Sequence, residues 1–84
     1  MYLHVGSETI VDERNIIGIF DIDNTSVSRL TRDFLRKKQD AGRVVNVTNE
    51  IPKAFIVCQA PDGRETVYLS QLAAATLKKR SGRL

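Results

Sequence analysis

Histidine and cysteine, which often act as nucleophiles, bases or metal ligands, occur once each in this chain. His4 is the single histidine, which excludes a His–His metal pair and an ordinary nucleophilic triad within one chain. Cys58 lies in an apolar run, where a buried thiol is inert. Asp21 and Asp23 lie close together, but the residues that follow them do not supply the further oxygen ligands of a calcium loop. The sequence also lacks a glycine-rich phosphate loop, so it predicts no enzymatic activity, no metal site and no cofactor.

Basic residues are grouped instead, which favours binding to phosphates. Arg29, Arg32 and Arg36 are three and four residues apart, with Lys37 beside them. A second group near the C-terminus contains Lys78, Lys79 and Arg80. Aromatic residues are not interleaved with either group, so contacts with the backbone of duplex DNA are favoured over stacking on single-stranded RNA. The spacings of a helix-turn-helix, a zinc finger and a basic zipper are all missing.

The charges are also sorted along the chain. Residues 1–24 contain five acidic residues and one basic residue, whereas residues 25–42 contain five basic and two acidic residues. Such sorting indicates a surface that meets a polyanion or the opposite surface of a neighbouring copy. The alternative is a solvated helix face followed by a basic tail.

The elements that would position these groups form an α+β domain of about six short, mostly antiparallel strands and two helices. We expect strands within residues 2–5, 9–11, 15–22, 44–47, 54–58 and 65–69, and Gly18 indicates either a bulge or a close backbone approach. The first helix is expected to begin at Ser26 or Ser28 and to end near Ala41, before Gly42. Its inward face is predicted to hold Val27, Leu30, Thr31, Phe34, Leu35 and Lys38. The second helix is expected to begin at Ser70, with Leu72, Ala73, Thr76 and Leu77 facing inward.

Length and composition predict one domain over residues 1–80 and a disordered basic tail over residues 81–84. A chain of 84 residues buries a small core, which self-association often completes. Residues 54–58 are apolar at every position, so we expect that strand to be covered on one face by the domain and on the other by a second subunit. Phe55 and Val57 are the predicted interface residues. A single cysteine and the lack of an apolar leader or membrane-spanning run favour a cytoplasmic protein with no membrane partner.

Four segments, in this order, resemble the extracellular matrix regulatory protein family (RemA/RemB), and their order and spacing are most similar to its RemB branch. They are Met1-Tyr2-Leu3-His4-Val5-Gly6, Arg14-Asn15-Ile16-Ile17-Gly18-Ile19-Phe20-Asp21, Pro52-Lys53-Ala54-Phe55-Ile56-Val57, and the stretch from Tyr68-Leu69-Ser70 to Thr76-Leu77-Lys78-Lys79-Arg80. The resemblance covers nearly the whole chain. It implies a cytoplasmic, DNA-binding regulator of matrix and biofilm genes, because RemA-type proteins form rings that display arginines repeatedly to promoter DNA.

Two positions differ from the RemA-type pattern that this resemblance implies. RemA-type proteins have an arginine just before the third strand, where this chain has Asn15 with Arg14 beside it. They also have consecutive arginines in the turn before the apolar strand, where this chain reads Asn49-Glu50-Ile51-Pro52 and only Lys53 is positive.

Two hypotheses therefore stay open. The first is a regulator that assembles as a homo-oligomer, such as a ring, and binds duplex DNA. The second is an oligomeric structural or interaction protein, pairing with a paralogue, that does not bind DNA directly. The candidate DNA-binding residues are Arg14, Arg29, Arg32, Arg36, Lys37, Lys53, Lys78, Lys79 and Arg80.

Overall fold

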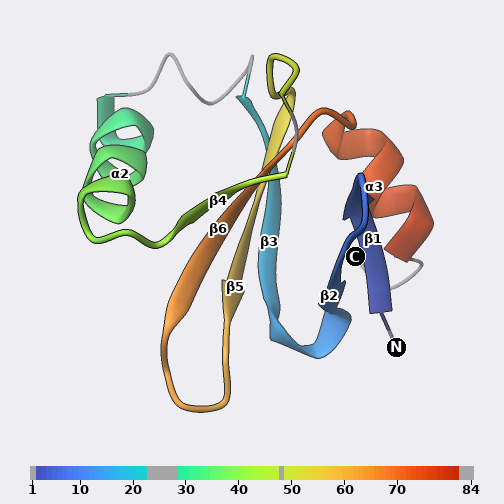
Figure 1. Cartoon of the computed structure of the whole chain (residues 1–84), viewed down its shortest axis with the longest axis horizontal. Coiled ribbons are helices and arrows are strands. Elements are labelled where there is room, and N and C mark those ends of the chain that lie inside the picture. Colours follow the sequence, from blue (N-terminus) through green and yellow to red (C-terminus); the bar gives the residue numbers. More distant parts are fainter. Residues whose placement is uncertain (1, 23–28, 48, 82–84) are drawn as a thin grey trace.

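A computed structural model describes residues 2–22, 29–47 and 49–81. Within these ranges it contains six strands, two α-helices and one short 3-10 helix (Figure 1). The elements are β1 (Tyr2–Gly6), β2 (Thr9–Asp12), η1 (Glu13–Asn15), β3 (Ile16–Asp21), α2 (Arg29–Asp40), β4 (Val44–Asn46), β5 (Ala54–Gln59), β6 (Glu65–Ser70) and α3 (Ala74–Ser81). The predicted α+β class, with mostly antiparallel strands, is confirmed. Within the described ranges, neither helix is long and apolar enough to cross a membrane.

Four of the strands form one sheet in the order β3-β5-β6-β4. The neighbours β3/β5 and β5/β6 are antiparallel, whereas β4/β6 is parallel because α2 carries the chain back across the sheet. The strands β1 and β2 form a separate hairpin. The register of β3 against β5 shifts between Ile16 and Gly18, which confirms the predicted bulge.

Each face of the sheet is covered by a different set of elements. Alternate residues of β5 point to opposite faces. Ala54, Ile56 and Cys58 pack with residues of the β1–β2 hairpin and α3, whereas Phe55 and Val57 pack with side chains of α2. The helices α2 and α3 therefore lie on opposite sides of the sheet (Figure 1).

This arrangement revises the reason for expecting a second subunit. The prediction that β5 is buried on both faces is confirmed, because Phe55 is 4% exposed and Val57 6% exposed. The second face, however, is covered by α2 of the same chain. The expectation that a second subunit is needed to cover this face of the strand was wrong.

Predictions for the helices are confirmed in part. The helix α2 ends at Asp40 and Gly42 has a φ of 72°, as expected for a left-handed residue after a helix. Phe34 and Leu35 pack inward as predicted, but Leu30 is 82% exposed. The N-cap predicted at Ser26 or Ser28 and the predicted inward residue Val27 lie outside the described residues.

The C-terminal helix departs further from the prediction. It begins at Ala74 rather than at Ser70, and its buried residues are Ala74, Leu77 and Ser81. Ala73 and Thr76 are exposed instead of facing inward. Because Ser81 ends α3 and is buried, it belongs to the folded domain and not to the predicted tail; residues 82–84 are not described.

Candidate nucleic-acid interface

The outer face of α2 carries a row of arginines that we call the α2 stripe, made of Arg29, Arg32 and Arg36. The spacing of three and four residues places them on one side of the helix, and Phe34 and Leu35 pack toward the sheet on the other. All three arginines and the neighbouring Lys37 are exposed. Among the described residues, none of these four side chains is in an ion pair. The α2 stripe therefore presents guanidinium groups to solvent in a form suited to phosphate contacts.

Two other bases near α2 have structural roles. Lys38 forms an ion pair with Glu65, with 2.6 Å between Nζ and Oε1, and its ammonium lies 5.7 Å from the centre of the Phe34 ring. The Arg43 guanidinium donates hydrogen bonds to the Glu65 carbonyl oxygen and the Thr66 hydroxyl. These contacts attach the C-terminal end of α2 to β6, so they fix the orientation of the α2 stripe.

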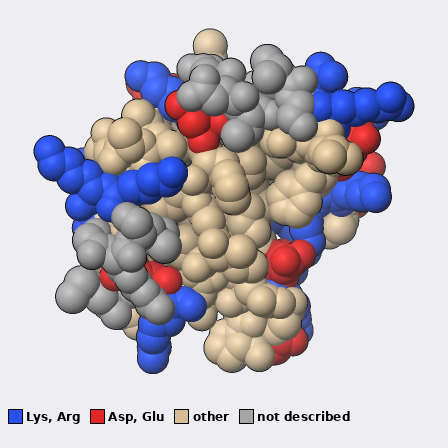
Figure 2. All heavy atoms as spheres, turned by 180° about the vertical axis from the view of Figure 1, so that it is seen from behind, with Lys and Arg blue, Asp and Glu red and all other residues tan. Residues whose placement is uncertain are grey.

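The last turn of α3 carries the second basic group. Lys78, Lys79 and Arg80 are exposed, whereas Leu77 is buried against the sheet. Basic residues in this position also interact favourably with the helix dipole. The two basic groups lie on opposite sides of the sheet within one chain, because α2 and α3 cover opposite faces (Figure 1). Figure 2, which shows one side of the molecule, has Lys and Arg side chains at several places around its margin and mostly uncharged surface at its centre.

Arg14 and Lys53 occupy different surroundings. The Arg14 guanidinium donates to both Asp12 carboxylate oxygens, from Nε to Oδ1 at 3.1 Å and from an Nη to Oδ2 at 2.7 Å. These side-chain hydrogen bonds hold the pKa of Asp12 at about 2. Arg14 is therefore already neutralised by a neighbour, which makes it a weaker phosphate ligand than the arginines of α2. Lys53 is exposed, and its backbone is held on both sides, by Ser70 and Ile22.

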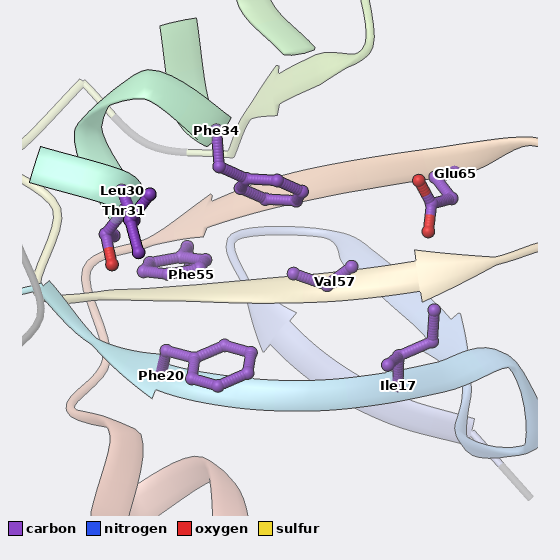
Figure 3. Close-up of a pocket in the computed structure, with 8 residues that line it drawn as sticks. All are labelled: Ile17, Phe20, Leu30, Thr31, Phe34, Phe55, Val57 and Glu65. Carbon is purple, nitrogen blue, oxygen red and sulfur yellow. The ribbon is translucent and has the colours of Figure 1, made fainter. Parts of the chain in front are cut away.

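An apolar hollow of about 460 Å³ lies between α2 and β3 (Figure 3). Phe55 and Val57 form its floor, and Phe34 and Leu30 project from α2 at one side. Phe20 and Ile17 of β3 line the other side. The Phe20 and Phe55 rings stack with centroids 5.1 Å apart. The predicted interface residues are thus part of this hollow, but at its base.

The most exposed lining residues were not selected from the sequence. Leu30, Ile17 and Phe20 are 82%, 54% and 39% exposed. Phe20 could have been found by pairing the two apolar runs, because Phe20 is the direct partner of Phe55 in the register of β3 and β5. Ile17 could not have been found in this way, because the bulge between Ile16 and Gly18 breaks the alternation that tells which face of the sheet a side chain points to.

The residues considered for chemistry have packing and local hydrogen-bonding roles. Burial raises the pKa of the Cys58 thiol to about 11, so the thiolate is not populated near neutral pH. The predicted packing role of Cys58 is confirmed. His4 is exposed, and its Nε2 is hydrogen-bonded to the Ser7 carbonyl oxygen in the turn after β1. Within the described ranges, no three His, Cys, Asp or Glu side chains lie together as a potential metal site.

Comparison with known proteins supports the resemblance seen in the sequence. Residues 2–81 match the family described as RemA-like, extracellular matrix regulatory protein A-like. The chain is also 36% identical over 81 residues to extracellular matrix regulatory protein B of Bacillus subtilis (strain 168), covering 96% of this chain and 90% of that protein. The similarity spans the sheet, both helices and the hairpin. The chain therefore belongs to the RemA-like family of extracellular matrix regulatory proteins.

Proposed function

We propose that this protein is a non-enzymatic regulator of extracellular matrix and biofilm genes, which binds duplex DNA in the cytoplasm as a homo-oligomer. The observation that carries the proposal is the α2 stripe, three exposed arginines on one side of a helix whose other side is packed on the sheet. Membership of a family of matrix regulatory proteins supports a role in regulation.

The geometry of the α2 stripe suits the phosphate backbone better than base edges. At a rise of 1.5 Å per residue, Arg29 and Arg36 lie about 10 Å apart along the helix axis. The three arginines can therefore meet successive phosphates of one strand. Contacts of this kind position a protein on DNA without reading its sequence. Four phosphate contacts from one subunit, including Lys37, would give weak binding, which repetition in an oligomer would strengthen.

The separation of the two basic groups defines their roles in this proposal. Because α2 and α3 lie on opposite sides of one chain (Figure 1), a short duplex on the α2 stripe does not reach α3 of the same subunit. Lys78, Lys79 and Arg80 would contribute where assembly brings α3 of a neighbouring copy onto the same duplex. Lys53 would add a single contact, and Arg14 would contribute least because Asp12 already neutralises it.

The alternative is an oligomeric structural or interaction protein that pairs with a paralogue and does not bind DNA. The turn before β5 favours it, because Asn49, Glu50 and Ile51 stand where the family resemblance implies arginines.

Fluorescence anisotropy with labelled duplexes separates the two proposals. We expect the double variant Arg32→Ala/Arg36→Ala to bind promoter and unrelated duplexes equally weakly. Its affinity for each duplex should fall about tenfold for each arginine removed. Arg64→Ala is the matched control, since Arg64 is also exposed but is paired with Asp62 in the β5–β6 turn. Binding of the control should equal that of the unaltered protein. If the unaltered oligomer binds no duplex at low salt, the interaction-protein alternative replaces DNA binding.

A further inference from the structure

The apolar hollow between α2 and β3 brings together every phenylalanine of the chain. The sequence contains three phenylalanines, and all three, Phe20, Phe34 and Phe55, line the hollow from β3, α2 and β5 (Figure 3). The volume of about 460 Å³ lies within the range of about 300–1,000 Å³ that is typical of small-molecule sites. We propose that the hollow binds an uncharged aromatic small molecule that carries a hydrogen-bond donor. This site is independent of DNA binding.

Gly18 fixes the shape of one wall of the hollow. The Phe20 ring lies over the Gly18 backbone, so closely that a Cβ atom added at Gly18 would be 2.6 Å from the Phe20 Cζ atom. The ring can therefore occupy this place only because Gly18 has no side chain. It also stacks on the Phe55 ring, with the centroids 5.1 Å apart and the ring planes at 23°, which is a favourable geometry for an aromatic pair. The two rings form a wall and a floor before any ligand arrives, and such preorganisation lowers the entropic cost of binding.

The lining of the hollow indicates the class of ligand. Three aromatic rings favour contact with a further ring, through stacked or edge-to-face arrangements. The polar side chains of the lining stand at its two ends, Thr31 beside Leu30 and Glu65 beside Val57 (Figure 3). Sites for small ligands combine an apolar wall with a few polar groups that fix the orientation of the ligand. The hollow has this composition, so it suits an aromatic body with a polar group at one end.

The ion pair between Glu65 and Lys38 determines the charge of the ligand. Oε1 of Glu65 lies 2.6 Å from Nζ of Lys38, so the carboxylate is already compensated. A cationic ligand would be repelled by the Lys38 ammonium, and an anionic ligand by the Glu65 carboxylate. Either would also lose its hydration in an apolar lining without gaining an unpaired counter-charge. An uncharged N–H or O–H group can donate to the carboxylate, which has several acceptor positions, while the ion pair stays intact.

Phenylalanine-selective isotope labelling tests the site by NMR, because all three phenylalanines line the hollow. The probe is N-phenylnaphthylamine, an uncharged aromatic amine with a single N–H donor. We expect saturable binding that shifts the ring signals of Phe20, Phe34 and Phe55 together. In a tyrosine-labelled sample, Tyr2 is the control, since it is 67% exposed and does not line the hollow. The absence of any phenylalanine shift would overturn the proposal, as would shifts of equal size at Tyr2.

Two substitutions and a matched control locate the bound probe by its fluorescence. Gly18→Ala should displace the Phe20 ring, and Leu30→Asp should place a charge at the rim of the hollow, where Leu30 is 82% exposed and its replacement leaves the fold intact. Each should weaken probe binding about tenfold. Ile10→Asp is the control and should bind as the unaltered protein does, since Ile10 is 58% exposed on the β1–β2 hairpin, outside the lining. Unchanged affinity in Leu30→Asp or in folded Gly18→Ala, or an equal loss in Ile10→Asp, would overturn the proposal.

Discussion

Ser70 joins three parts of the fold, and its replacement by alanine gives the sharpest test of the packing. The residue is fully buried. Its hydroxyl donates to the Val5 carbonyl oxygen at 2.5 Å and accepts from the Leu72 amide at 3.0 Å. Val5 lies where the β1/β2 register is irregular, between the paired residues His4 and Gly6. Ser70 therefore connects the hairpin, β6 and the turn that leads to α3.

The cost of Ser70→Ala follows from the groups that it leaves without a partner. A buried backbone group that loses its hydrogen bond costs about 1–3 kcal/mol. Val5 is fully buried and the amide of half-buried Leu72 is closer to water, so we expect a total loss of about 2 kcal/mol. For a domain of this size, the melting temperature should fall by roughly 8–16 °C.

Circular dichroism during thermal and urea unfolding, at equal protein concentrations, measures this loss. Thr76→Ala on the exposed side of α3 is the control and should change stability by less than about 0.5 kcal/mol. If the free energy of unfolding of Ser70→Ala lies within about 0.5 kcal/mol of that of the unaltered protein, the stabilising role assigned to the Ser70 hydrogen bonds is refuted.

Three further predictions concern single sites. The Cys58 thiol, with a pKa of about 11, should react slowly with a thiol reagent at pH 8 in the folded protein, and rapid labelling would contradict its burial. Because the thiol of the unfolded chain loses its proton at lower pH, the free energy of unfolding should also fall between about pH 9 and 11. Gly42→Ala places a side chain at a φ of 72° and should cost about 1 kcal/mol in urea unfolding; an unchanged midpoint would contradict the strain. The Asp12 carboxyl should show a pKa of about 2 in an NMR titration. Any stability from its pair with Arg14 is therefore retained above the ordinary carboxyl range and lost as the pH falls toward 2. Arg14→Ala should raise the pKa of Asp12, and an unchanged pKa would contradict the pairing.

Local patterns in the sequence predicted the elements and the solvent-facing side of α2. The spacing of Arg29, Arg32 and Arg36 was sufficient, because residues three and four apart share a side of a helix whatever the helix packs on. The uninterrupted apolar run of β5 likewise predicted burial on both faces. These predictions depend on neighbours along the chain, so they needed no knowledge of the topology.

Features that depend on contacts between distant parts of the chain could not be predicted from local sequence patterns. Ser70 has the residue type of a helix cap, but its hydroxyl is used by Val5, sixty-five residues away, and α3 begins later. Leu30 has the spacing of a core residue, yet it projects from α2 at the rim of the hollow, where it is 82% exposed. The placement of the two basic groups on opposite faces also depends on the strand order, which no local pattern specifies.

The salt dependence of duplex binding tests whether the α2 stripe contacts DNA phosphates. One subunit offers four exposed cations on α2, Arg29, Arg32, Arg36 and Lys37. Neutralisation of four phosphates would give a log–log slope of about −3.6 at most. If several copies bind one duplex, the measured slope should be steeper, on the order of −7 or beyond, and Arg32→Ala/Arg36→Ala should reduce it by about 2 for each copy engaged. A slope that is unchanged in the double variant, or no binding at about 50 mM salt, would contradict phosphate binding by the α2 stripe.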